Sequence, residues 1–169
     1  MKRLLLSLFL SLTWLGVSAQ GTITTSPPLA SNNGSGGITF QVSSTAPVEI
    51  TGISNIFSTG ASSASVWVRV GGAQTPPNVS TANGWVEVIQ GAAITGANST
   101  SAVAIPFGST VINVPANTPV GIFIEGQTRY QTGTTADQVV FSDGTFTVNV
   151  ADSVAYGGNL PSPTFNPRR

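Results

Sequence analysis

Ser65–Val70 reads Ser-Val-Trp-Val-Arg-Val, and this run decides the class of the fold. Its valines alternate with serine, tryptophan and arginine, which is the period of two that sends successive side chains to opposite faces of a β-strand. Trp85–Gln90 repeats the alternation, with Val86 and Val88 on one face. The two runs flank a loop, Gly72–Asn83, and we predict that they pair as neighbouring strands.

The rest of the chain divides in the same way into short strands separated by turn residues. Apolar residues nowhere recur at helical spacing over three turns, and β-branched residues dominate. We therefore predict an all-β protein, an antiparallel β-sandwich or jelly roll of about eight to ten strands. Asp143-Gly144 predicts a hairpin with a type I′ turn, which needs positive φ at both residues. The other predicted strands are Ile38–Ser43, Val48–Thr51, Ile53–Phe57, Ala102–Phe107, Val111–Val114, Val120–Glu125, Val139–Phe141 and Thr145–Val150.

The first residues, Met1–Ala19, are typical of a secretory signal peptide. Lys2 and Arg3 precede the apolar stretch Leu4–Val17, and small residues follow at the cleavage positions. An uncleaved signal anchor is the alternative, although the stretch is short for a bilayer span of about 20 residues. No later segment could span a membrane. We expect residues 20–37 to be a flexible N-terminal segment and residues 38–169 to form a single β-sandwich domain.

Composition excludes most active sites. The chain has no histidine and no cysteine, and beyond the predicted leader it has no lysine and no methionine. Ser–His–Asp and Cys–His catalysis need an imidazole or an equivalent base, and zinc or copper sites need His or Cys. The few arginines form no basic cluster, so nucleic acid is excluded as a partner. We predict no catalytic residue, no cofactor and no metal.

The carboxylates offer two weaker alternatives. Glu49, Glu87 and Glu125 each lie within a predicted strand, and a pair of such carboxylates could hydrolyse a glycosidic bond. We interpret them instead as outward-pointing residues that keep the protein soluble. Calcium could use oxygen ligands from the aspartates, but no dense acidic loop appears in the chain. The aspartates considered are Asp137, Asp143 and Asp152.

An aromatic face is the best candidate for ligand binding. If Val66 and Val68 face the core, then pairing of the two opening strands puts Trp67 opposite Glu87 and Arg69 opposite Trp85 on the other face. Such a face could stack a sugar ring on an indole, with Arg69 over the ring of Trp85. The alternative is structural, namely ordinary cross-strand packing or burial of a tryptophan under the loop. The candidate ligand-binding residues are Trp67, Arg69, Trp85 and Glu87.

Several short motifs resemble a β-sandwich module of secreted surface proteins from Bacteroidetes. The resemblance covers nearly the whole chain after the leader. It rests on Gly37–Phe40, Pro47–Ile53, Val66–Gly71, Gly84–Val88, Val111–Ala116, Pro119–Ile124, Tyr156–Gly158 and Phe165–Arg168.

The resemblance implies an extracellular or cell-surface module of large, often adhesin-like proteins exported by the type IX pathway. The family usually continues past the Pro-Arg motif with another strand, whereas this chain stops at Arg169. The sandwich could therefore lack its last strand. The chain would then be a fragment of a longer protein, or an open sheet edge would be left for strand addition by a partner.

Two functional hypotheses follow. The first is a non-catalytic, secreted adhesion or structural module of a cell-surface protein, whose partner is an extracellular protein or a glycan. The alternative is a carbohydrate-binding module that uses the exposed Trp/Arg/Glu face. Neither hypothesis makes the chain an enzyme.

Overall fold

The computed structural model describes residues 21–25, 33–73, 79–130, 140–157 and 164–167, with the backbone alone from residue 151 onward. The predicted leader and its cleavage site lie outside these residues. In the described ranges no helix is long and apolar enough to cross a membrane. The elements are β1 (Asn33–Ser44), β2 (Val48–Ile50), β3 (Ser54–Ile56), β4 (Gly60–Val70), the 3₁₀ helix η1 (Thr81–Asn83), β5 (Val86–Gly96), β6 (Ala102–Ala104), β7 (Ile112–Val114), β8 (Val120–Tyr130), β9 (Val140–Ser142), β10 (Phe146–Gly157) and β11 (Thr164–Pro167).

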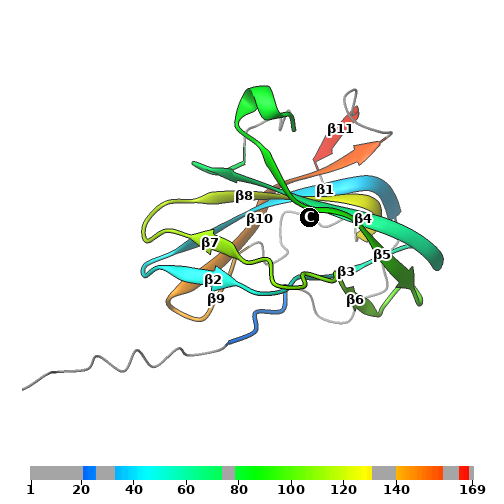
Figure 1. Ribbon diagram of the computed structural model, residues 1–169, viewed down its shortest axis with the longest axis horizontal. Coiled ribbons are helices and arrows are strands. Elements are labelled where there is room, and N and C mark those ends of the chain that lie inside the picture. The colour runs from blue at the N-terminus through cyan, green and yellow to red at the C-terminus, as the bar shows by residue number, and fades with distance from the viewer. Residues whose placement is uncertain (1–20, 26–32, 74–78, 131–139, 158–163, 168–169) are drawn as a thin grey trace, which may run out of the picture.

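The predicted all-β architecture is confirmed. One large antiparallel sheet has the strand order β11-β10-β1-β8-β4-β5, with β9 pairing to β10. Two short antiparallel pairs, β2 with β7 and β3 with β6, form a second layer. Figure 1 shows this second layer along one side of the large sheet and η1 on the opposite side. We call the side turned toward the second layer the inner face and the other side the outer face.

The strand pairs are nested, as in a jelly roll. β4 pairs with β5, β3 with β6, β2 with β7, and β1 with β8. The nested pairs form one long hairpin centred on the β4–β5 connection. This hairpin is folded over, so that β8 also pairs with β4. Such a pairing joins residues far apart in sequence, and periodicity alone does not predict it.

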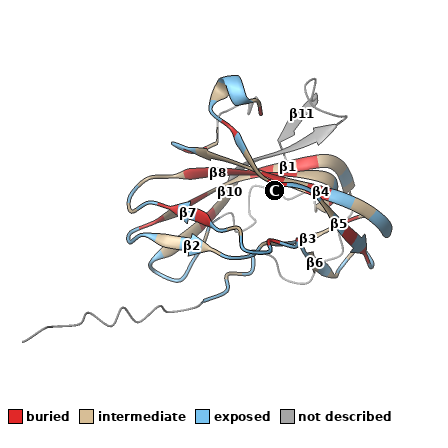
Figure 2. Ribbon diagram, viewed as in Figure 1, coloured by how far each residue is buried: buried red, intermediate tan, exposed pale blue. Residues whose placement is uncertain are grey.

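Alternating apolar residues build the core between the two layers. Val66 on β4 and both Ile122 and Ile124 on β8 are at most 2% exposed, as expected for the inward positions of paired strands. Each such side chain stabilises the fold by about 1.5–3 kcal/mol on burial. Figure 2 shows buried residues on the large sheet and on the layer facing it. The buried core residues are Val42, Phe57, Ala64, Val66, Ile89, Ile94, Ile105, Phe107, Ile112, Val114, Val120, Ile122, Ile124 and Val148.

Five strands are longer than predicted, among them β8, which extends to Tyr130, and β10, which extends to Gly157. β1 begins at Asn33, so the last five residues of the segment expected to be flexible belong to a strand. β4 begins at Gly60, and β5 extends to Gly96. The added residues are mostly Gly, Ala and Ser, which have weak strand propensity. Neighbouring strands hold them, because the hydrogen bonds of a sheet override local preference.

The hairpin at Asp143-Gly144 forms, but its turn is not of type I′. Only Gly144 has positive φ, at 95°, whereas Asp143 does not. The Asp143 carboxylate instead accepts hydrogen bonds from the backbone N–H groups of Thr145 and Phe146, both at 2.8 Å. This Asx-type arrangement satisfies the turn through the side chain. The hydrogen bonds from Phe146 and Thr145 lower the pKa of Asp143, because they stabilise the charged carboxylate.

Candidate functional site

The predicted pairing of the two opening strands is confirmed, although Trp85 lies just before β5 and outside the paired residues. Trp67 on β4 lies opposite Glu87 on β5, and Val68 lies opposite Val86. On its other side Trp67 lies opposite Phe123 of β8. Because Val66 and Ile124 face the core, Trp67 and Phe123 lie on the outer face of the large sheet.

Part of the outer face is closed by the connection between β4 and β5. We call Gly72–Gly84 the covering segment, of which residues 74–78 are outside the described part of the chain. Val79 from this segment, Trp85 and Phe123 are 4%, 1% and 1% exposed and form a second hydrophobic cluster. Trp67 and Ala73 pack against that cluster. We call this region the closed half of the outer face.

Trp85 is therefore not exposed, and the prediction that it shares an open face with Trp67 is wrong on this point. Burial under the loop, the structural alternative, describes Trp85 correctly. Its indole Nε1 is also buried and has no hydrogen-bond partner among the described residues. Glu87, Arg69 and Trp67 are each partly exposed.

Arg69 fastens the covering segment to the sheet. Its Nε donates to the carbonyl of Asn83 at 2.9 Å, and its Nη1 donates to the carbonyl of Gly72 at 2.7 Å. One guanidinium thus satisfies a carbonyl at each end of the segment, a use to which its fixed fork of donors is suited. In addition, the backbone N–H of Gly71 donates to the carbonyl of Pro119 at 2.8 Å. These two side-chain bonds of Arg69 hold the loop.

Two glycines allow the closed half to pack closely. A Cβ at Gly37 would lie 2.4 Å from the ring of Phe123, and a Cβ at Gly121 would lie 2.6 Å from the backbone nitrogen of Ala73. Neither distance is possible between real atoms. The Phe123 ring can therefore pack on β1, and the covering segment on β8, only because glycine has no side chain at these two positions. The closed half is consequently packed like a core.

Trp67 also connects the closed half to the residues beyond it. Its Nε1 donates to Oε2 of Glu125 on β8 at 3.2 Å. The two side chains come from adjacent strands, since Glu125 lies opposite Ser65. The bond holds the carboxylate at the border of the closed half and leaves Oε1 without a partner among the described residues.

The three strand glutamates do not gather at one point. Glu49 lies exposed on β2 in the second layer. Glu87 and Glu125 share the outer face but lie on β5 and β8, with β4 and Trp67 between them. Among the described residues no three His, Cys, Asp or Glu side chains could jointly hold a metal ion. Asp137 and the side chain of Asp152 lie outside the described part of the chain.

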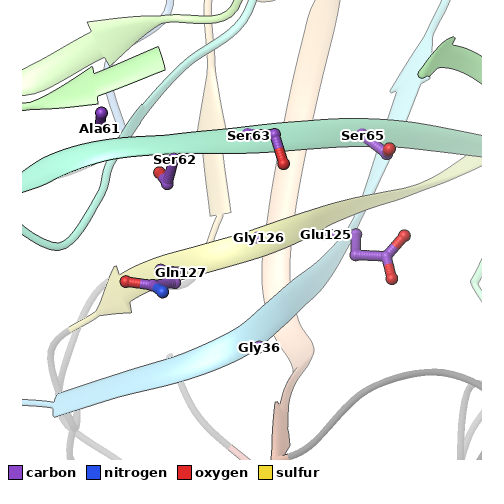
Figure 3. Close-up of a pocket in the computed structure, with 8 residues that line it drawn as sticks. All are labelled: Gly36, Ala61, Ser62, Ser63, Ser65, Glu125, Gly126 and Gln127. Atoms are coloured by element: carbon purple, nitrogen blue, oxygen red, sulfur yellow. The ribbon is translucent and has the colours of Figure 1, made fainter. Parts of the chain in front are cut away.

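The remaining part of the outer face is open and polar. A groove of about 520 Å³ runs over β4, β8 and β1, and Figure 3 shows the side chains that line it. We call it the open groove. Its size falls within the range of about 300–1,000 Å³ that is usual for small-ligand sites. It is lined by Gly36, Ala61, Ser62, Ser63, Ser65, Glu125, Gly126 and Gln127.

The groove residues were not singled out by the sequence, apart from Glu125. Their individual side chains are common in turns and on strand surfaces. The signal that could have found them is nonlocal, because β4 and β8 must first be placed side by side. Once Trp67 is opposite Phe123, alternation brings Ser65 opposite Glu125.

Comparison of the chain with protein-family models, with curated proteins and with solved structures found no match.

Proposed function

We propose that this chain is a non-catalytic, exported adhesion or structural module of a cell-surface protein. The observation that carries the proposal is the division of the outer face. One half is packed shut by the chain's own loop, and the other presents a shallow polar groove on a frame of paired strands. A surface of this kind suits binding, since it offers several hydrogen-bonding groups to a partner.

The predicted leader at residues 1–19 and the resemblance to secreted surface modules of Bacteroidetes support export. The absence of cysteine and histidine from the whole chain supports a role without covalent or zinc chemistry. The partner in this proposal is an extracellular protein or a glycan.

The carbohydrate-binding alternative, with an exposed Trp/Arg/Glu face, is less well supported. It needs Trp67 and Trp85 together as an open stacking surface, and Trp85 is 1% exposed. Trp67 alone remains accessible at the border between the closed half and the open groove.

Strand addition at a sheet edge is a further partner mode that we propose. β5 stands at one end of the strand order, and β4 is its partner among the described strands. Register shifts interrupt the β4–β5 pairing between Ala64 and Trp67. Ala92–Gly96 pairs without interruption, so this stretch is the part of the edge best suited to accept another strand.

The experiment for the main proposal measures retention and turnover together. Beads coated with the chain from residue 20 are passed over surfaces coated with polysaccharides, with extracellular proteins or with neither, and the same protein is incubated with chromogenic glycosides. Selective retention without turnover is expected. Turnover that disappears in Glu125→Gln would show an enzyme, and equal retention on coated and bare surfaces would contradict an adhesive role.

A further inference from the structure

The open groove carries groups for hydrogen bonding and almost none for apolar contact. Ser63 and Ser65 supply hydroxyls from β4, and Glu125 and Gln127 supply a carboxylate and an amide from β8. Figure 3 shows the serines along one strand, with Glu125 and Gln127 on the strand beside it. Gly126 and Gly36 also line the groove and add no side chain to it.

The chemistry of the lining excludes several kinds of ligand. Anions are disfavoured, because the one charged lining residue is Glu125. A multivalent cation would find a single carboxylate, whereas calcium sites use six to eight oxygen ligands that commonly include several carboxylates. A peptide could not add as a strand there, because β4 and β8 are each already paired on both edges. An uncharged ligand rich in hydroxyl groups remains.

One further observation indicates a binding site. The bond from Trp67 Nε1 holds Glu125 in place, so its free Oε1 is already oriented at the end of the groove. A fixed acceptor loses little conformational entropy on binding.

We propose that the open groove binds an uncharged saccharide, with Glu125 Oε1 accepting a hydrogen bond from a sugar hydroxyl and the serines and Gln127 serving other hydroxyls. The indole of Trp67 lies next to Glu125 and borders the same end of the groove. This inference deepens the proposed binding function and rests on it. It moves the recognition surface from Trp85 and Arg69, which the covering segment uses, to the neighbouring polar residues.

The first test blocks the groove. Calorimetric titration of the chain from residue 20 with neutral hexasaccharides of glucose, xylose and mannose is compared between wild type and Ser63→Ile. Ser63 is exposed and lies in the groove, so a β-branched side chain there fills the groove without disturbing the core. The matched control is Ala93→Ile, because Ala93 is the exposed cross-strand partner of Ser63 but does not line the groove. Binding is expected to weaken at least about tenfold in Ser63→Ile and to stay unchanged in Ala93→Ile. The loss of one good hydrogen bond is enough for a tenfold change in affinity.

The second test removes the charge of the acceptor. Glu125→Gln is expected to weaken binding about ten- to a hundredfold, since hydrogen bonds to charged groups contribute more than neutral ones. Glu87→Gln, a change on the same face but outside the groove, is expected to leave the affinity unchanged. Circular dichroism of all four variants confirms that each is folded.

The outcomes separate this inference from the proposed function. No binding of any hexasaccharide by the wild type, or equal binding by wild type and Ser63→Ile, would overturn the saccharide site. If selective retention on coated surfaces persists in Ser63→Ile beads, the adhesive function stands and its contact surface lies elsewhere. If both retention and saccharide binding are absent in the wild type, both proposals fail.

Discussion

The closed half and the open groove share the same two strands and differ in almost everything else. On β8 the five residues Val120–Ile124 are all buried, whereas Glu125–Gln127, which follow directly, are partly or fully exposed. On β4 exposure decreases along the chain instead. Ser63 is exposed, whereas Val66 faces the core and Trp67 is partly covered. The antiparallel pairing of β4 with β8 brings the two exposed stretches together at one end and the two covered stretches together at the other.

Alternation along a strand sets the face on which a side chain lies but does not set its exposure. Phe123 and Glu125 both lie on the outer face, two positions apart. Phe123 is 1% exposed because the covering segment and the ring of Trp85 lie near it, and Glu125 is reached by solvent because nothing described covers it. Substitutions that open the closed half, or that remove the bond between the two halves at Trp67, test this difference.

The largest effect is expected for Trp85→Ala. Removing a fully buried indole leaves a cavity, which should lower the free energy of unfolding by about 3–5 kcal/mol. Urea denaturation of wild type and variant measures the difference. Val86→Ala is the matched control, because Val86 is the next residue and is 57% exposed, and it should change stability by less than about 1 kcal/mol. Similar losses for the two variants would show that the closed half is not packed as a core.

Gly37→Ala should come next. The added Cβ would lie 2.4 Å from the Phe123 ring and must displace it, which should cost about 1–3 kcal/mol of stability. Gly52→Ala is the control, since a Cβ there would meet no atom within 4 Å and its φ is not positive. Thermal denaturation of both variants decides the point, and an unchanged melting temperature for Gly37→Ala would contradict the close approach of β1 to Phe123.

Trp67→Phe tests the connection between the halves. It keeps an aromatic ring against the cluster but removes the N–H that donates to Glu125. The loss should be about 1 kcal/mol, below the usual value for a charged partner because both side chains are partly exposed. A double-mutant cycle with Glu125→Gln isolates the bond from the packing. A coupling energy of zero would mean that the indole and the carboxylate act independently.

The smallest effect is expected at Asp143, which lies away from both halves and serves as a reference. Its folded-state pKa is lowered from 3.8, so its carboxylate stabilises the fold above that pH, and the contribution is lost as pH falls through the lower folded value. Asp143→Ala should therefore be slightly less stable than wild type near neutral pH and equal to it in strong acid. Urea denaturation at several pH values measures this. A stability difference that does not shrink on acidification would contradict the role of the charge.

Much of the fold was predictable from local pattern. The alternation in Ser65–Val70 and Trp85–Gln90 correctly predicts two strands, their pairing and the faces of Trp67 and Glu87. The strand ends at Asn33 and Gly96 were not predictable, because Gly, Ala and Ser prefer no strand strongly and are held there by partners distant in sequence. Burial of Trp85 depends on the path of a loop. The position of Glu125 beside Trp67 depends on the pairing of two strands, because the two residues are 58 positions apart in the sequence.

The amino-acid sequence alone predicts that this chain forms strands, which side chains of each strand share a face, and which reactive groups are missing. These properties follow from the period of two and from composition, which act residue by residue. Three features follow from long-range packing instead: β8 lies beside β4, the covering segment closes over Trp85, and serines, Gln127 and Glu125 line one groove. These features arise from contacts between distant segments, whose order is set by the packing of the whole chain.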